Sequence, residues 1–338
     1  MPNSEKPIVA VTMGDPCGIG PEVIARALAE KEVNNLCLPI VIGSTWALEQ
    51  AVNLTGVSLK VRPIDDVEEA EESPELANIV DPHNLNPEDI TVGQISPACG
   101  KAAMEWVTTA AKLAMAGKVQ ALATAPVNKE AASLAGYKAI GHMELLQEVS
   151  GTEKVATMLM SGSLRVVHLT THRSLRVACE YVTKERVQSM LELTHRSFRE
   201  WGMPHPRIAA AALNPHASDG GLLGAEEAEA IGPAVEEAQR HGIDARGPVP
   251  ADIVFHQAIK GAYDVVLAMY HDQGHIPIKV YGFEQSVSVN LGLPFVRTSV
   301  DHGTAFDIAG KGVADHTSMV ETIRLASALC TGKGLSRP

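Results

Sequence analysis

The sequence lacks several features that would assign it to a broad class at once. No stretch approaches the ~18 consecutive apolar residues that a membrane-spanning helix requires, so we expect no membrane partner. The opening segment, MPNSEKP, has no basic region followed by an apolar one, so we expect no secretory signal. The five cysteines are scattered and form no CxxC pair, which favours a reducing cytoplasm over a disulfide framework or a zinc–thiolate site.

The chain also lacks an excess of positive charge, because its net charge is -12 at pH 7. Acidic residues crowd into DDVEEAEE at positions 65–72, which we interpret as a solvated face or loop. The negative sign argues against nucleic acid and acidic membrane surfaces as partners. An anionic substrate would therefore need a local cluster of cations in its binding pocket.

No internal repeat, low-complexity segment or flexible linker is evident. At 338 residues, however, the chain is long for one core, so we expect two domains around a cleft. Apolar strand-like runs alternate with helical segments, which is the pattern of an α/β fold with mostly parallel strands. The expected strands are 8–13, 39–42, 119–123, 156–160, 164–169, 208–213 and 265–270. Helices are expected to begin near Pro21, Pro97 (capped by Ser96), Glu144, Thr183, Ala225 and His316, with stops near Gly202 and Gly242.

Three of the strand-like runs, VVHLTTH, AAAALNPH and VVLAMYH, end in His172, His216 and His271. Ligands of open α/β sheets bind at the carboxyl ends of strands, so three imidazoles would converge there. Three imidazoles with an open position form a catalytic metal site, and nitrogen ligands favour zinc, cobalt or nickel over magnesium. The alternative is that each histidine is a hydrogen-bonded structural residue. His168, inside its apolar run, is interpreted as core.

Three other segments carry weaker candidates. The glycine-rich turn GDPCGIGPE could present backbone N–H groups to an anion, but a plain tight turn explains it equally well, and no GxGxxG fingerprint is present. Lys279 and Arg297 flank Ser288 and Asn290 in a segment with many turn residues, which suits a phosphate or carboxylate unless both are surface cations. The dense turn segment DHGTAFDIAGK predicts a binding loop.

Six motifs together resemble the 4-hydroxythreonine-4-phosphate dehydrogenase family of vitamin B6 biosynthesis: VTMGDPCGIGPE, ATAPVNKE, TTH, LNPHASDGG, AMYHDQG and LGLPFVRTSVDHGTAFDIAGKG. The resemblance runs from about residue 8 to residue 325. The last motif also resembles the HGSAPDIAGKG loop of isocitrate and isopropylmalate dehydrogenases, which surrounds the adenine end of the nicotinamide cofactor. The resemblance implies their two-domain α/β/α fold with mostly parallel sheets, an active site in the interdomain cleft, and cofactor binding without GxGxxG.

The resemblance also implies roles for individual residues. A divalent metal, zinc with cobalt or magnesium as alternatives, would be held by His172, His216 and His271 across a homodimer interface. Substrate-binding positions fall on His142, Met143, Lys279, Ser288, Asn290 and Arg297. Positions for NAD, or alternatively NADP, fall on Asp301, His302, Gly303, Thr304 and Asp307. Met143 replaces the family threonine and Ser288 the family asparagine, while HDQGHIPIK is similar to relatives that act on D-threonate or D-erythronate 4-phosphate.

We therefore expect metal- and NAD-dependent oxidative decarboxylation of 4-hydroxythreonine 4-phosphate or of D-threonate or D-erythronate 4-phosphate, small anionic substrates. The expected catalytic residues are Lys279, Asp252 and Asp272. Alternatives are a dehydrogenase of an aromatic cis-dihydrodiol carboxylate, a metal-dependent hydrolase or phosphatase, and a ligand-binding sensor. The expected domains are 1–130 plus 295–338, with the cofactor loop, and 131–294, with the metal ligands and dimer interface.

Overall fold

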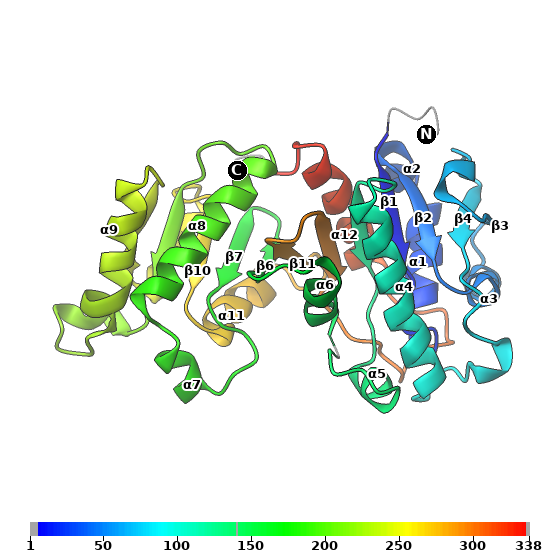
Figure 1. Ribbon diagram of the computed structural model, residues 1–338, viewed down its shortest axis with the longest axis horizontal. Helices are drawn as coiled ribbons and strands as arrows, with labels where there is room; N and C mark the ends of the chain where they lie inside the picture. Colours follow the sequence, from blue (N-terminus) through cyan, green and yellow to red (C-terminus); the bar gives the residue numbers. More distant parts are fainter. Residues whose placement is uncertain (1–5, 140, 336–338) are drawn as a thin grey trace. The chain divides into compact units, whose positions relative to one another are not determined.

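The computed structural model describes residues 6–139 and 141–335 (Figure 1). The chain divides into two compact units. The first contains the described residues of Met1–Glu153 and Leu293–Thr331, and the second those of Lys154–Gly292 and Gly332–Pro338. Within the described residues, every helix is too short or too polar to cross a lipid bilayer.

The first unit is built on a parallel sheet with the strand order β3-β4-β2-β1-β5-β12. The strands are β1 (Ile8–Thr12), β2 (Leu38–Ile42), β3 (Lys60–Pro63), β4 (Leu76–Val80), β5 (Ala121–Thr124) and β12 (Val296–Val300). Strands β1, β2, β5 and β12 are buried along their whole length, as is usual for parallel strands between two neighbours.

The helices of the first unit are α1 (Gly20–Ala29), α2 (Lys31–Leu36), α3 (Thr45–Thr55), α4 (Pro97–Met115), α5 (Lys129–Leu134), α6 (His142–Ser150) and α12 (Thr317–Cys330), with short 3₁₀ turns η1 (Val67–Glu69) and η2 (Pro87–Asp89). The predicted start of α4 is confirmed: Pro97 is its first residue, and the Ser96 hydroxyl accepts the N–H of Cys99. Helices α5 and α6 pack on α4, so residues 131–153 lie in the first unit.

The second unit has a mixed sheet with the order β11-β6-β7-β10-β8-β9. Strand β6 (Ala156–Ser161) runs antiparallel to β7 (Leu164–His168) and β11 (Val287–Leu291), whereas β7, β10 (Val265–Ala268), β8 (Ile208–Ala211) and β9 (Ala245–Val249) are parallel. Its helices are α7 (Leu175–Glu180), α8 (Lys184–Glu200), α9 (Gly232–Arg240), α10 (Ala251–Ile259) and α11 (His271–Tyr281), with the 3₁₀ segment η3 (Pro215–Asp219) and the π-helical turn η4 (Glu227–Ile231). The expected α/β fold with mostly parallel strands is confirmed.

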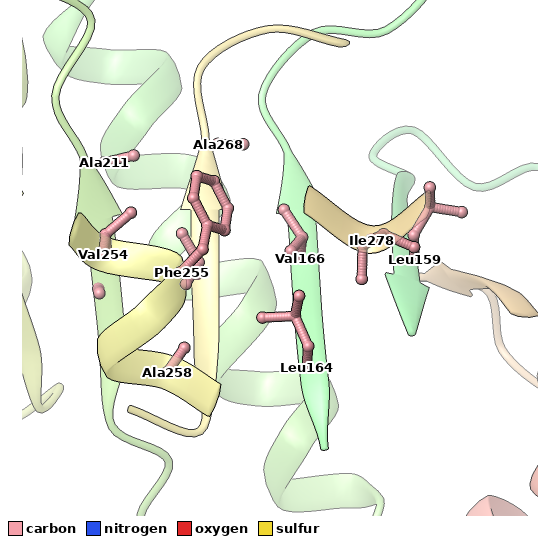
Figure 2. Close-up of a cluster of buried hydrophobic side chains, with 11 residues drawn as sticks. Leu159, Leu164, Val166, Ala211, Val254, Phe255, Ala258, Ala268 and Ile278 are labelled. Carbon is pink, nitrogen blue, oxygen red and sulfur yellow. The ribbon is translucent and has the colours of Figure 1, made fainter. Parts of the chain in front are cut away.

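A buried apolar cluster joins α10 and α11 to the sheet of the second unit (Figure 2). Leu164 and Val166 of β7 contribute to it, together with Phe255 of α10 and Ile278 of α11. Because side chains alternate along a strand, His168 shares the face of Leu164 and Val166. This places His168 beneath α11, and its 2% exposure confirms the interpretation of this residue as core.

The sequence interpretation assigned no helix or strand to residues 271–300, where the structure has three elements. The segment from Lys279 to Arg297 is not dominated by turns: Lys279 lies on α11, Ser288 and Asn290 on β11, and Arg297 on β12. The segment after β10 is the helix α11, which contains Pro277. The predicted helix stops are confirmed, because Gly202 and Gly242 have φ values of 92° and 80° just after α8 and α9.

Candidate active site

Arg297 is a buried cation of the first unit, with 4% of its surface exposed. Its Nε and Nη2 both donate to the Oγ1 atom of Thr124, at 3.1 and 2.6 Å. The two residues meet because β12 and β5 are neighbouring parallel strands. Burial lowers the pKa of Arg297 to about 9, and the carboxylate of Glu144 opposes this shift. A buried guanidinium near a strand end is suited to an oxyanion ligand.

His142 opens α6 in the same unit. Burial lowers its pKa well below the usual range, and the charges of Arg297 and Lys129 lower it further, so the ring is neutral at pH 7. Its Nε2 atom is buried and has no hydrogen-bond partner within the part of the chain that the structure describes. An unsatisfied buried nitrogen is costly unless a ligand pairs with it. His142, Arg297 and Lys129 therefore form a candidate anion site.

The sequence interpretation found two of these residues by resemblance and missed Thr124 and Lys129. Both belong to the motif ATAPVNKE, which ends β5 and begins α5. A polar residue directly after a buried strand was the available signal. Met143 is the second residue of α6 and directly follows His142 in the sequence. Its side chain is half-buried.

The second unit brings two of the three predicted metal ligands together. The rings of His172 and His271 lie with their centroids 5.8 Å apart. His271 also stacks on His275, with centroids 3.6 Å apart and an interplanar angle of 12°, and its Nδ1 lies 2.6 Å from Oδ1 of Asp272. The carboxylate thus orients the imidazole and leaves Nε2 for a ligand.

His216 lies in the segment η3, which follows β8. Among the described residues, the ligand atoms of His172, His216 and His271 do not form a group within 4.8 Å of one another. Binding of one metal ion by all three imidazoles stays a prediction. Sharing of the ligands between two subunits remains a prediction.

The loop that carries His216 has an unusual backbone. His216, Ala217, Ser218 and Asp219 all have positive φ values, between 47° and 65°, a conformation that costs free energy and persists only when its surroundings enforce it. The buried carboxylate of Glu227 fixes the start of this loop by accepting the N–H groups of Leu213 and Asn214, at 2.8 and 2.7 Å, and the Asn214 side-chain amide at 2.9 Å. Glu227 lies on the π-helical turn η4, a distortion frequent at functional sites. The sequence interpretation missed this residue.

The remaining candidates of the second unit are placed on different elements. Asp252 is exposed in the first turn of α10. Lys279 lies in the last turn of α11, with its ammonium 4.7 Å from the centre of the Phe283 ring. Ser288 is half-buried and Asn290 is buried on β11.

The predicted cofactor loop is held by α1 within the first unit. Glu22, which is 3% exposed, accepts the N–H groups of Gly310 and Gly312, at 2.5 and 3.0 Å. The carbonyl of Thr304 accepts the N–H of Ile19 at 3.0 Å. The loop is thus fixed against the glycine-rich turn that follows β1. Its other candidates, Asp301, His302, Gly303 and Asp307, lie in the same irregular segment.

A cavity of about 220 Å³ adjoins this loop. Its lining is mostly apolar and includes Gly18, Trp46, Leu54, Val92 and Gly310. A concave, apolar lining with few polar groups is typical of a site for a flat organic ligand.

The chain matches known proteins along most of its length. Residues 35–326 match the family model described as "Pyridoxal phosphate biosynthetic protein PdxA". The chain is 45% identical over 326 residues to the D-threonate 4-phosphate dehydrogenase of Cupriavidus necator, with 96% of this chain and 98% of the relative covered. It is 44% identical over 334 residues to the 4-hydroxythreonine-4-phosphate dehydrogenase of Geobacter metallireducens, with coverages of 99% and 98%.

A solved structure agrees with these relatives. The crystal structure of a 4-hydroxythreonine-4-phosphate dehydrogenase from Klebsiella pneumoniae superposes with a TM-score of 0.90 at 42% identity, covering 97% of this chain and 99% of the other. Sequence and structure thus agree over both units, and the resemblance expected from the six motifs is confirmed. The chain belongs to the PdxA family of dehydrogenases.

Proposed function

We propose that this chain catalyses the NAD-dependent oxidative decarboxylation of a phosphorylated four-carbon 3-hydroxy acid. The substrate would be 4-hydroxythreonine 4-phosphate or D-threonate or D-erythronate 4-phosphate. The single observation that carries the proposal is the candidate anion site, in which buried Arg297 and the unpaired Nε2 atom of His142 lie near the exposed Lys129, in a member of this dehydrogenase family. Such a site suits the phosphate that the named substrates of both relatives share.

Each group of the anion site would have a defined task. The Arg297 guanidinium would bind the phosphate through charge-assisted hydrogen bonds, and Thr124 would hold its fork in position. The neutral His142 would form a hydrogen bond to the same anion through Nε2. Fixing the substrate at its phosphate places the reacting alcohol at a constant distance, which lowers the entropic part of the barrier.

The histidines of the second unit would serve the reacting end. His172, His216 and His271 would hold a divalent ion, zinc with cobalt or magnesium as alternatives, which lowers the pKa of an alcohol and stabilises charge on an enolate. Asp272 would keep His271 in the ligating orientation. Lys279 would move the proton released from the alcohol, with Asp252 as the alternative group. Hydride leaves the alcohol carbon for NAD, and the resulting 3-keto acid loses carbon dioxide.

The loop at 301–311 and its neighbouring cavity would bind the cofactor. NAD is favoured by the family, and NADP is the alternative. Trp46 and Leu54 offer flat apolar surface for an adenine ring, while Asp301, His302 and Asp307 offer polar groups for the ribose. We further propose that the enzyme acts in the cytoplasm as a homodimer in which the subunits share the metal ligands.

The choice among substrates depends on Met143. A methionine cannot donate the hydrogen bond of the threonine that the family usually has here, so the ligand must differ or must find another donor. Sequence identity does not discriminate between the two substrates, because the relatives named for D-threonate 4-phosphate and for 4-hydroxythreonine 4-phosphate are 45% and 44% identical to this chain.

A substrate panel tests the proposal. Purified enzyme with NAD is mixed in turn with 4-hydroxythreonine 4-phosphate, D-threonate 4-phosphate, D-erythronate 4-phosphate and an aromatic cis-dihydrodiol carboxylate, and the absorbance of reduced nicotinamide is followed. At least one phosphorylated acid is expected to be oxidised, with release of carbon dioxide. Activity confined to the diol would overturn the proposal, as would phosphate release without reduction of NAD.

A further inference from the structure

Two cysteines that are 82 residues apart in the sequence meet in the first unit. The Sγ atom of Cys17, in the glycine-rich turn after β1, lies 3.3 Å from the Sγ atom of Cys99, in the first turn of α4. Asp15 contributes a carboxylate oxygen, and the three ligand atoms all lie within 4.8 Å of one another. All three side chains are fully buried. Two sulfurs and an oxygen at this spacing form a ligand set for a thiophilic ion.

The carboxylate of Asp15 is only half satisfied by the protein. Its Oδ1 accepts the N–H of Cys17 at 2.9 Å. Its Oδ2 is buried and has no hydrogen-bond partner within the described residues. A buried carboxylate oxygen without a partner is costly, and a cation beside the two sulfurs would satisfy it.

We propose that Asp15, Cys17 and Cys99 bind a structural zinc ion, distinct from the histidine ligands of the second unit. Zinc–sulfur bonds of about 2.3 Å place two sulfurs on a tetrahedral ion about 3.8 Å apart, so the observed pair must separate by about 0.5 Å. A disulfide of about 2.05 Å would instead require an approach of about 1.2 Å. Of these two states the ion requires the smaller movement, and unlike the thiol–thiol hydrogen bond it also satisfies the Oδ2 atom of Asp15.

Binding of the ion releases protons, so that the charge of the ion is compensated by two thiolates. Both thiols become thiolates and give their two protons to solvent. The position of Cys99 in the first turn of α4 favours its thiolate, since the helix N-terminus carries partial positive charge. In the reduced protein without the ion, the Cys99 thiol donates to the carbonyl oxygen of Asp89 at 3.4 Å.

The ion would connect two segments of the first unit directly and a third through one of them. Asp15 and Cys17 belong to the turn that follows β1, and this turn packs against the cofactor loop, where a Cβ on Gly18 would meet the Thr304 carbonyl at 2.7 Å. Cys99 belongs to α4. The ion would therefore fix the turn to α4 and, through the turn, support the cofactor loop. The sequence interpretation did not expect a zinc–thiolate site because it looked for a CxxC pair, whereas the fold brings these cysteines together.

Cobalt substitution tests this site without reference to activity. The protein is produced in zinc-depleted medium with Co²⁺, so that the ion enters during folding, and is purified with a non-thiol reductant. Thiolate–cobalt bonds absorb strongly in the near ultraviolet, whereas cobalt bound by histidine does not. We expect this band in the wild type and in the control Cys179→Ala, and its loss in Cys17→Ala and Cys99→Ala.

Two further measurements complete the test. Metal analysis should find one ion per chain more in the zinc-grown wild type than in Cys17→Ala. Chelation should lower the melting temperature of the wild type by roughly 5 °C more than that of Cys17→Ala, because both proteins keep the histidine ligands and only the wild type has the cysteine-bound ion. Asp15→Asn keeps the shape of the side chain and should weaken the cobalt band without removing it.

Three results would overturn the proposal. The first is a wild-type protein without the sulfur–cobalt band. The second is an unchanged band in Cys17→Ala, since alanine is tolerated in a small buried turn position and the variant is expected to fold. The third is an intramolecular Cys17–Cys99 disulfide in protein purified without reductant, together with no bound ion in the reduced protein, which would identify a redox pair instead. Loss of the histidine-bound ion in His271→Ala would leave the band intact, so this site and the proposed catalytic site fail independently.

Discussion

Replacement of Arg297 by lysine tests the anion site most directly. Lysine keeps the positive charge in the buried position but replaces a planar fork with a single ammonium group. One charge-assisted hydrogen bond to the substrate is therefore lost, worth about 1.5–3 kcal/mol. This corresponds to a roughly 10- to 150-fold fall in kcat/KM. Because the phosphate is bound before and during the reaction, most of the change should be a rise in KM.

The assay is steady-state reduction of NAD with the best substrate of the panel. Arg324→Lys is the matched control, since Arg324 pairs with Glu321 on the surface of α12 and is remote from the candidate site in the sequence. Arg297→Ala should lower kcat/KM further than Arg297→Lys, because it removes the charge and also leaves the Thr124 hydroxyl without its two donors. Melting temperatures separate loss of binding from loss of folding. Values of kcat/KM within threefold of the wild type for both Arg297 variants would refute the anion site.

Three other outcomes are expected. Glu227→Ala should lower the free energy of unfolding by about 2–4 kcal/mol in urea titrations, because the amides of Leu213 and Asn214 lose their acceptor. Glu227→Gln keeps an acceptor oxygen and should retain most of the wild-type stability. Equal stability of the two variants would contradict this. Burial lowers the pKa of His168 to about 3, below its unfolded value of about 6.5, so the unfolded state binds the proton first and stability is lost as pH falls through this interval. His168→Leu should lessen that acid destabilisation, and an unchanged pH profile of unfolding would disprove it. His216→Ala should lose both turnover and bound metal, and full retention of each would refute its role.

The sequence predicted seven strands as continuous apolar runs: β1, β2, β5, β6, β7, β8 and β10. It missed β4, β11 and β12, and it also missed the two edge strands β3 and β9. Strand β3 lies at one end of its sheet and is half-exposed, and β9 at the end of the other contains Gly247 and Pro248. Edge strands contact a single neighbour, so their sequences carry little hydrophobic signal. No local pattern was available for either strand.

Helix α11 was missed for a different reason. Its sequence, HDQGHIPIKVY, contains a glycine and a proline, both of which disfavour a helix interior. Tertiary contacts hold it instead: the Gln273 side chain accepts the N–H of Met269 and donates to the carbonyl of Ala212, both at 2.7 Å. Gly274 is required because a Cβ there would lie 2.3 Å from the Nε2 atom of His168. Contacts of this kind depend on residues far away in the sequence.

The same distinction explains which site residues the sequence could find. A polar residue after a buried strand is visible locally, which is how His172, His216 and His271 were selected. Whether two such residues meet depends on the order of the strands in the sheet. That order results from contacts between distant segments and cannot be predicted from one segment alone. Thr124 meets Arg297 only because β5 pairs with β12, and Cys17 meets Cys99 only because α4 begins beside the turn after β1. His172 and His271 likewise end different strands and meet through the pairing of β7 with β10, which brings their ring centroids to 5.8 Å.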